Sequence, residues 1–267
     1  MSGDQMGFLT PEPVLYHGHA TGFALFGAGH LVSLAMSAAL AAVLVTCYLH
    51  LPADAQGPSP ARRHQLLAMS GTACAILLAK DLWYLVLGLF EPLFWPLHVC
   101  NLCELVALLY ALSPTSRLGL RMADLLFCWG ITGSLGALLF PGWAYYCPTW
   151  SLASICGFVE HALVLACALC SLVGGDYAPR PSRVWFPLVA SVACGAVFRI
   201  VNPRLGTNFF FVTNPAAAGG PGPWLLATLG DPGFLVGYLL MVVALWAATY
   251  LARRAIVSPN HRREPHA

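Results

Sequence analysis

The sequence predicts an all-α integral membrane protein, a bundle of seven transmembrane helices that forms a single polytopic domain. The chain has 267 residues, of which 58% are hydrophobic and only 9% are charged. An ordinary soluble domain is about a quarter charged and has enough polar residues to cover its core. Several mostly apolar runs of about 18 residues or more are each long enough to cross the hydrocarbon layer as a helix.

The first three predicted spans are separated by links that are polar, rich in proline, or both. A Pro/Gly/Ala linker with Arg62 and Arg63 follows the first span, and the short link 90–96 follows the second. Pro96 stands at the first turn of the third span, where a helix tolerates proline. About twenty helical residues match the hydrocarbon thickness of about 30 Å. These three spans cover residues 22–49, 64–89 and 97–112.

The last four predicted spans alternate with links in the same way. The link 113–117 precedes the fourth span, and an aromatic, proline-containing loop over residues 141–150 follows it. A Gly- and Pro-rich loop over 174–183 separates the fifth span from the sixth. A similar segment over 202–231 precedes the seventh and is unusually long for a loop. These four spans cover residues 118–140, 151–172, 184–201 and 234–251.

The distribution of charge predicts the orientation of the bundle. Arginines gather on alternate links and in the tail, whereas the opposite links carry the aromatic residues of an interfacial belt. The positive-inside rule then predicts a multi-pass cell-membrane protein with an outside N-terminus and a cytoplasmic C-terminus. Residues 1–21 become an extracytoplasmic lead, 22–251 the seven spans, and 252–267 a basic tail. The arginines are Arg62, Arg63, Arg117, Arg121, Arg180, Arg183, Arg253, Arg254, Arg262 and Arg263.

Composition also argues against several classes of function. The chain has one lysine and no basic aromatic patch, so we expect no nucleic-acid partner. No basic segment precedes an apolar core at the N-terminus, so we expect no cleavable signal peptide. The pairs Cys100/Cys103 and Cys167/Cys170 lie at different depths and do not suit one four-ligand zinc site. We therefore expect no metal and no other cofactor, and the oligomeric state stays open.

Polar residues inside the predicted spans converge on one level of the bilayer. Followed in the predicted orientation, five helices bring such residues to the outer half or to mid-depth. Ionisable groups in a bilayer usually face the bundle interior or a water-filled cavity, and they mark functional sites. We therefore predict a polar cavity that opens toward the extracytoplasmic side. The converging residues are His30, Lys80, Asp81, His98, Cys100, Asn101, Cys103, Glu104, Glu160, His161, Arg199 and Asn202.

A purely structural interpretation stays open for part of this set. Lys80, Asp81 and Arg199 are equally well explained as an ion-pair network, because unpaired charge in lipid is costly. Glu160 is as suitable a partner for Arg199 or Lys80 as it is a catalytic group. His30 is slightly better explained as a hydrogen-bonding residue between helices.

Two histidines and one cysteine are the candidate catalytic residues. His98 and His161 favour a function, since histidine is the usual proton shuttle near neutral pH. Cys100 lies in a first helical turn, where the helix dipole stabilises a thiolate. Cys100 and Glu104 share one helix face, whereas His98 and Asn101 share another. A base for Cys100 is therefore expected from another helix, and His161 is the candidate.

Several segments resemble a known family. They are Pro96-Leu-His-Val-Cys-Asn101, Glu160-His-Ala162, Val201-Asn-Pro-Arg-Leu-Gly-Thr-Asn208 with Phe209-Phe-Phe211, and Gly222-Pro-Trp224, together with His30. These segments resemble the YwaF-type integral membrane proteins of bacteria, which are similar to an animal family of transmembrane acyltransferases. The resemblance implies acyl transfer between membrane phospholipids by a third-span Cys and a fifth-span His. His161 matches that His, but Leu97 occupies the position of that Cys, immediately before His98.

Hypotheses of different classes follow. In the first, the chain is an intramembrane lipid-acyl transferase or hydrolase that acts on membrane phospholipid or another lipid-like substrate. Cys100 or an activated water attacks the ester, His161 is the base, and His98 or Asn101 stabilises the oxyanion. The alternative is a non-enzymatic solute-binding or transport protein, or a membrane scaffold. The candidate substrate-binding residues are Asn101, Arg199, Asn202, Asn208, His30 and Glu160.

Overall fold

The computed structural model describes residues 7–18, 23–54, 56–215 and 220–257, and these residues form helices and no β-strand. Six of the helices are long and apolar enough to cross a membrane, and a shorter apolar helix covers Val99–Leu112. The all-helical, multi-pass membrane class is therefore confirmed. The exact number of seven spans and the orientation of the termini stay predictions. The six candidate spans are Ala28–His50, Pro60–Val86, Arg117–Ala144, Leu152–Val173, Pro181–Leu205 and Gly222–Arg254.

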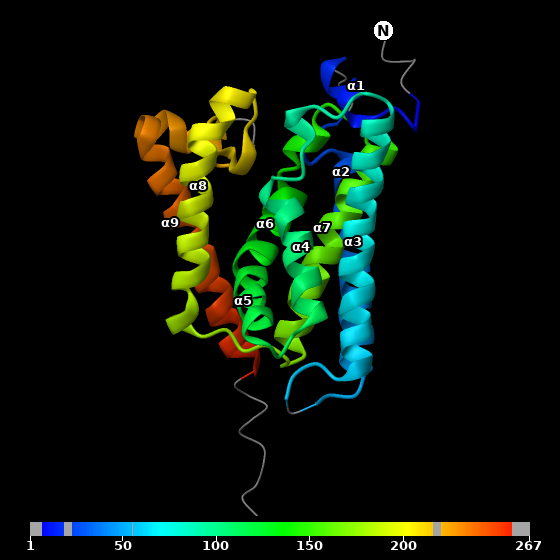
Figure 1. Ribbon diagram of the computed structural model, residues 1–267, viewed down its shortest axis with the longest axis vertical. Coiled ribbons are helices and arrows are strands. Elements are labelled where there is room, and N and C mark those ends of the chain that lie inside the picture. Colours follow the sequence, from blue (N-terminus) through cyan, green and yellow to red (C-terminus); the bar gives the residue numbers. More distant parts are fainter. Residues whose placement is uncertain (1–6, 19–22, 55, 216–219, 258–267) are drawn as a thin grey trace, which may run out of the picture.

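The helices follow one another with short connections (Figure 1). A π-helical segment, Leu126–Gly130, joins α5 to α6, so that these two helices and the segment between them form one candidate span. The helices are α1 (Glu12–His17), α2 (Ala28–His50), α3 (Pro60–Val86), α4 (Val99–Leu112), α5 (Arg117–Leu125), α6 (Ile131–Leu139), α7 (Leu152–Val173), α8 (Trp185–Leu205) and α9 (Gly222–Val257).

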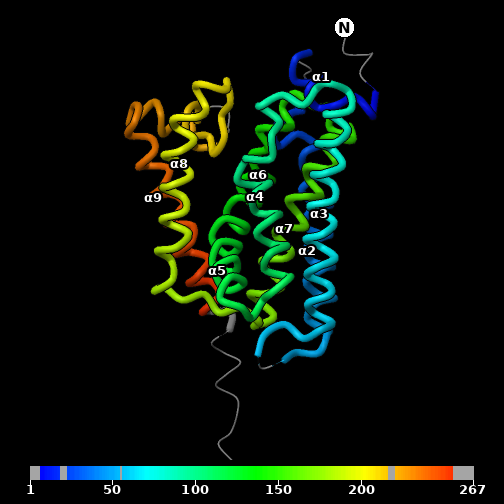
Figure 2. The backbone as a smooth tube through the Cα atoms, in the orientation of Figure 1, coloured from blue at the N-terminus to red at the C-terminus, as the bar shows by residue number. Residues whose placement is uncertain are grey.

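Helix α7 is the centre of the bundle and packs against α2, α3, α4 and α6. Helices α8 and α9 lie to the other side of α5 and α6 (Figures 1 and 2). There α8 contacts α5, and α9 contacts α6 and α7. The helices therefore form a main bundle, α2 to α7, and a side formed by α8 and α9.

The flanks of the molecule are apolar. Large side chains such as Leu78 and Leu82 on α3, Val189 on α8, and Val236 and Leu240 on α9 are exposed. Apolar surface of this extent is rare on a soluble monomer and suits contact with lipid.

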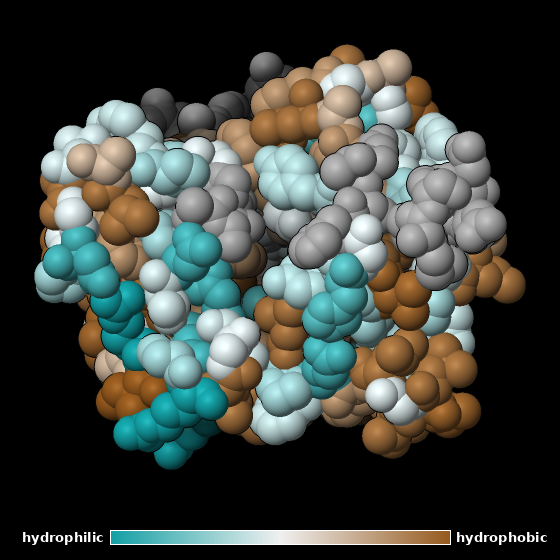
Figure 3. Space-filling view, turned by 90° about the horizontal axis from the view of Figure 1, so that it is seen from above, coloured by the Kyte–Doolittle hydropathy of each residue, from teal (hydrophilic) through white to brown (hydrophobic). Residues whose placement is uncertain are grey.

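The two ends of the bundle differ. One end carries α1 and the links before α4, before α7 and before α9 (Figure 1). Figure 3 looks onto this end and shows hydrophilic and hydrophobic residues mixed across it, with a hollow near the middle. The predicted basic face lies at the other end, where α3 and α5 begin and α9 ends. Arg262 and Arg263 lie outside the described residues.

One predicted boundary at the basic end is wrong, the start of the second span at residue 64. Helix α3 begins at Pro60, because Ser59 caps it by accepting a hydrogen bond from the Arg62 backbone N–H at 3.3 Å. Arg62 and Arg63 are therefore helical and do not belong to the linker.

The long loop predicted over residues 202–231 is also wrong. Helix α8 continues through Pro203 to Leu205, and Gly206 follows as its C-cap, with a φ of 67° in the left-handed region that glycine adopts without strain. A 3₁₀ turn, Phe209–Phe211, follows, and α9 begins at Gly222. The link between α8 and α9 therefore covers only residues 206–221 and contains this turn. Helix α9 is itself broken at Gly230 and Asp231, where φ and ψ are not helical.

Candidate functional site

A cavity of about 510 Å³ lies between α4, α6 and α7 on one side and α8 and α9 on the other. Small residues make room for it: a Cβ atom built at Gly133 or Gly136 on α6 meets nothing within 4 Å. Most of the lining is apolar, and its few polar side chains include Cys100, His161 and Arg199. The volume and lining are typical of a site for an apolar ligand that carries a few polar groups.

This cavity differs in character and in membership from the predicted polar cavity. His30, Lys80, Glu104 and Glu160 do not line the cavity. They face other parts of the helix bundle, because residues at one depth on a helix point in different directions around its axis. Depth along the membrane was therefore not enough to decide which side chains share a site.

His161 on α7 has one nitrogen engaged and one free of protein partners. Its Nδ1 lies 2.6 Å from the backbone oxygen of Gly157, one helical turn earlier. A carbonyl oxygen only accepts, so Nδ1 carries the hydrogen, and Nε2 of the neutral ring holds the lone pair. Nε2 is closed to solvent and has no hydrogen-bond partner in the described part of the chain. The side chain is 6% exposed, and its tautomer is that of a general base.

Trp143 lies flat against the imidazole of His161. The two rings are 6° from parallel, with centroids 5.8 Å apart. Gly157 makes this approach possible, because a Cβ atom there would come within 2.6 Å of the indole ring. Trp143 belongs to a 3₁₀ turn, Gly142–Ala144, in the link between α6 and α7, and it also lines the cavity. From the sequence, Trp143 is one of the aromatic residues of the link 141–150, which are assigned to the interfacial belt.

Cys100 lies near the start of α4 and lines the same cavity as His161. Its Sγ contacts the Oδ1 of Asn101 at 3.7 Å, a weak hydrogen bond. The two catalytic candidates are not hydrogen-bonded to each other, because Nε2 of His161 is without a partner and Nδ1 is bound to Gly157. No group of three His, Cys, Asp or Glu side chains among the residues that the structure describes is placed to hold a metal ion.

Arg199 on α8 lines the cavity and ties α8 to two other segments. Its Nη1 donates to the Val212 backbone oxygen at 2.8 Å, and its Nη2 pairs with Asp231 at the break in α9. Both partners of this ion pair are partly exposed, at 33% and 46%. Arg199 is therefore a cation in the cavity wall that an anionic group can reach.

Lys80 pairs with Glu160, one of the two partners that the sequence left open for that carboxylate. Its Nζ lies 2.9 Å from Oε2 of Glu160 and joins α3 to α7. The other Glu160 oxygen and Oε2 of Glu104 are buried and without a partner among the described residues. The adjacent Asp81 is not the partner of Lys80 in any ion pair that the described residues form.

His30 is fully engaged between helices. Its Nδ1 accepts a hydrogen bond from the Phe26 backbone N–H at 3.0 Å, and its Nε2 lies 2.8 Å from the Leu138 oxygen. Because that oxygen only accepts, Nε2 is the donor, and His30 links α2 to α6. The structural interpretation of this buried histidine accounts for both of its nitrogens.

Asn202 organises the turn that follows α8. Its Oδ1 accepts from the Phe209 N–H and the Thr207 hydroxyl, both at 3.0 Å. Its Nδ2 donates to the Phe209 oxygen at 3.0 Å and to Thr213 Oγ1 at 3.1 Å. Asn202 is buried and does not line the cavity, but Phe210, next to its partner, does.

Asn208 and His98 support the same turn. Asn208 donates to the Asn214 oxygen at 2.7 Å and accepts from the Asn214 N–H at 2.9 Å. His98 precedes α4 as its N-cap residue, and its ring meets those of Phe209 and Phe211 at centroid distances of 5.0 and 5.9 Å. Neither residue lines the cavity, and neither does Asn101.

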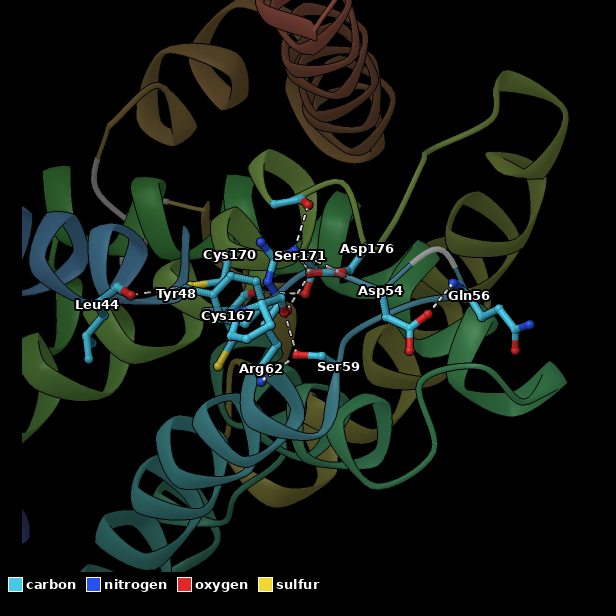
Figure 4. Close-up of polar contacts among 12 residues, drawn as sticks. Leu44, Tyr48, Asp54, Gln56, Ser59, Arg62, Cys167, Cys170, Ser171 and Asp176 are labelled. Carbon is cyan, nitrogen blue, oxygen red and sulfur yellow. Dashed lines mark hydrogen bonds and ion pairs between the residues drawn. The ribbon is translucent and has the colours of Figure 1, made fainter. Parts of the chain in front are cut away.

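A second polar cluster, which sequence reasoning missed, lies at the basic end of the bundle (Figure 4). Arg62 is only 4% exposed, and its Nη1 lies 3.1 Å from Oδ2 of Asp176 and 2.9 Å from the Gly174 oxygen. The Tyr48 hydroxyl donates to Asp176 at 2.7 Å, and its ring lies 5.0 Å from the guanidinium. The available signal was Tyr48, a polar group near the end of an apolar span.

These features define a multi-pass integral membrane protein that carries a mainly apolar cavity with a buried histidine in its wall. The chain belongs to the TMEM164 family, whose model matches residues 25–250. No curated protein and no solved structure matches the chain. The family match confirms the predicted class of transmembrane protein, whereas the YwaF-type label stays a resemblance.

Proposed function

We propose that this protein is an intramembrane lipid-acyl transferase or hydrolase whose reacting groups line the cavity beside α7. The observation that carries the proposal is His161, a buried imidazole with a free Nε2 lone pair in the wall of an apolar cavity. The apolar lining suits an acyl chain. Arg199 suits the phosphate of a phospholipid headgroup.

His161 moves the proton in the proposed reaction. Its Nε2 takes a proton from the attacking atom, which is the Cys100 thiol or the oxygen of water or of an acceptor lipid. The attacking atom bonds to the ester carbonyl carbon, the ester C–O bond breaks, and Nε2 returns the proton to the leaving oxygen. If Cys100 attacks, an acceptor hydroxyl then takes the acyl group from the thioester in a second transfer.

An acyl-exchange assay tests this function. Purified protein in phospholipid vesicles is given a phospholipid with a labelled acyl chain, and transfer or release of that chain is measured. We expect His161→Ala to lower turnover at least about 10²-fold, the usual contribution of a general base. His64→Ala, an exposed histidine in the first turns of α3, is the matched control. Unchanged turnover in His161→Ala contradicts the proposal.

The Cys100→Ala variant separates two chemical routes. Loss of turnover together with loss of a hydroxylamine-sensitive acyl-protein intermediate favours attack by the thiol. Retained turnover favours direct attack by water or by the acceptor lipid, with His161 as base in both routes.

A second candidate function is solute binding or proton-coupled transport, and it is favoured by the buried polar groups outside the cavity. Lys80 and Glu160 form a partly buried ion pair, and carboxyl oxygens of Glu104 and Glu160 are buried without a partner among the described residues. Buried ionisable groups of this kind are typical of proton pathways. This candidate requires that acyl turnover is absent and that saturable binding or flux depends on Lys80, Asp81 and Glu104.

We place the protein in the cell membrane, with its N-terminus outside and the basic end in the cytoplasm. The grouping of arginines at one end of the bundle supports this orientation. This orientation is tested by introducing a single cysteine at Gln56 or at Trp150 and labelling it with a membrane-impermeant reagent, in intact cells and in opened cells. The proposed substrate is a membrane phospholipid, and no nucleic-acid partner is proposed.

A further inference from the structure

We propose that Trp143 is a ligand-binding residue whose indole N–H donates a hydrogen bond to the carbonyl oxygen of an acyl ester in the cavity. The inference rests on the proposed function and names the group that holds the ester. Neither the fold nor the family match assigns a role to this tryptophan.

The indole N–H of Trp143 is a buried donor without an acceptor. Its Nε1 is closed to solvent and has no hydrogen-bond partner among the described residues. Indole Nε1–H can only donate, so nothing but an acceptor can satisfy it. Buried donors are nearly always paired, so an unpaired one needs an explanation, and a ligand in the cavity that Trp143 lines supplies one.

Two other buried indoles in the same fold do have acceptors. Trp129, which also lines the cavity, donates to the Ser191 hydroxyl at 2.8 Å. Trp246 donates to the Cys128 backbone oxygen at 2.5 Å. The protein thus supplies an acceptor to the indole N–H of Trp129 and of Trp246. It supplies none to Trp143 among the described residues, and this difference needs an explanation.

The position of Trp143 complements that of His161. Their rings are stacked, one carries an unpaired donor, Nε1–H, the other carries an unpaired acceptor, Nε2, and both residues line the same cavity. An ester under attack needs these two groups, an acceptor for the proton of the attacking atom and a donor for the carbonyl oxygen. Both atoms are closed to solvent, so the inference requires that lining side chains move aside when the ester binds.

The donor is most useful in the transition state. When the attacking atom bonds to the carbonyl carbon, the C=O electron pair moves onto oxygen, and negative charge builds up beside the indole N–H. When the ester C–O bond breaks, that pair re-forms the carbonyl. The indole keeps its proton throughout, while His161 accepts and returns the proton of the attacking atom.

The local structure keeps Trp143 in this position. Gly157 leaves the face of α7 open to the indole, since any Cβ there would lie within 2.6 Å of the ring. Phe158 closes the next face, edge-on to the indole, at 5.1 Å and 68°. The site is therefore shaped by the packing of the loop 140–151 against α7.

Trp143→Phe removes the N–H and keeps an aromatic ring. The readout is binding of two probes to purified protein, a monoacylglycerol and the matching alkyl glycerol ether, which lacks only the carbonyl oxygen. Wild type should bind the ester roughly 3- to 10-fold more tightly, the value of one neutral hydrogen bond, and Trp143→Phe should abolish this preference. The variant should also lower acyl turnover about 10²-fold.

Trp129→Phe is the matched control, because it deletes an indole N–H that already has an acceptor. Trp129→Phe should change the affinities for the two probes by the same factor, if it changes them at all. The preference for the ester should therefore remain. If Trp143→Phe fails to fold, Trp143 is replaced by benzothienylalanine, which has the shape of tryptophan with sulfur in place of N–H.

The outcomes separate this inference from the proposed function. An ester preference that is absent in wild type, or retained without the N–H of Trp143, overturns the role of Trp143. An ester preference that depends on Trp143 in a protein without acyl turnover supports the inference for binding and rejects the enzymatic function.

Discussion

Two neighbours, Gly157 and Trp143, determine the tautomer and the orientation of the His161 ring. The backbone oxygen of Gly157 fixes the proton on Nδ1, and the ring of Trp143 fixes the plane of the imidazole. Both effects depend on Gly157. Its backbone oxygen binds Nδ1, and because it has no Cβ atom, the Trp143 ring can approach. The orientation of the base therefore depends on a residue that carries no functional group.

Gly157→Ala should lower acyl turnover by about tenfold or more and destabilise the protein. The added methyl group would overlap the indole ring, and overpacking of this kind costs about 1–3 kcal/mol. Turnover and thermal unfolding in detergent are the measurements. Gly71→Ala on α3 is the control, since its Cβ meets nothing within 4 Å, and helix propensity favours alanine. Unchanged turnover in Gly157→Ala would show that Trp143 does not position the base.

At the scale of elements, the polar side chains of this protein mostly join helices to each other. Lys80 and Glu160 join α3 to α7, His30 joins α2 to α6, and Arg199 joins α8 to the break in α9. The Asn202 side chain binds both the backbone N–H and the backbone oxygen of Phe209 and so stabilises the turn after α8. In a bilayer, where the hydrophobic effect does not drive helices together, packing and such bonds hold the bundle.

Asp176→Asn should destabilise the protein by about 3–5 kcal/mol, because it leaves Arg62 as a buried charge without a counter-ion. The cluster joins α2, α3 and the link after α7, so its loss should also loosen the basic end of the bundle. Thermal unfolding and hydrogen exchange of peptides from that end are the measurements. Asp54→Asn, in the nearby exposed link, is the control. Equal stabilities of the two variants would contradict this account.

At the scale of the whole molecule, the cavity lies where α8 and α9 face the main bundle. Glycines on α6 widen the space between them. The cavity is therefore bounded by mostly apolar helix faces and reaches His161 on α7 from the side of α8 and α9. An acyl chain fits this geometry because most of the wall is hydrocarbon.

If the proposed acyl transfer takes place in this cavity, Gly136→Leu should shift the preference toward shorter acyl chains. The new side chain would extend into the cavity, where a Cβ meets nothing within 4 Å, and it should leave folding intact. Competition between phospholipids of different chain length in the acyl-exchange assay gives the measurement. Gly71→Leu, which points away from the cavity on α3, is the control. An unchanged chain-length profile would mean that the acyl chain lies elsewhere.

The amino-acid sequence by itself determined the membrane class and most of the helices, because hydropathy and helix signals are local properties of the chain. It also singled out His161, Cys100 and Arg199, since polar residues in apolar runs are few. Only the tertiary structure decided that these three share one mainly apolar cavity, whereas Glu160 and His30 face elsewhere. The reason is that the rotation of each helix is set by packing against distant segments, and no local pattern records it. The same holds for Trp143, whose free N–H is visible only when its neighbours are in place.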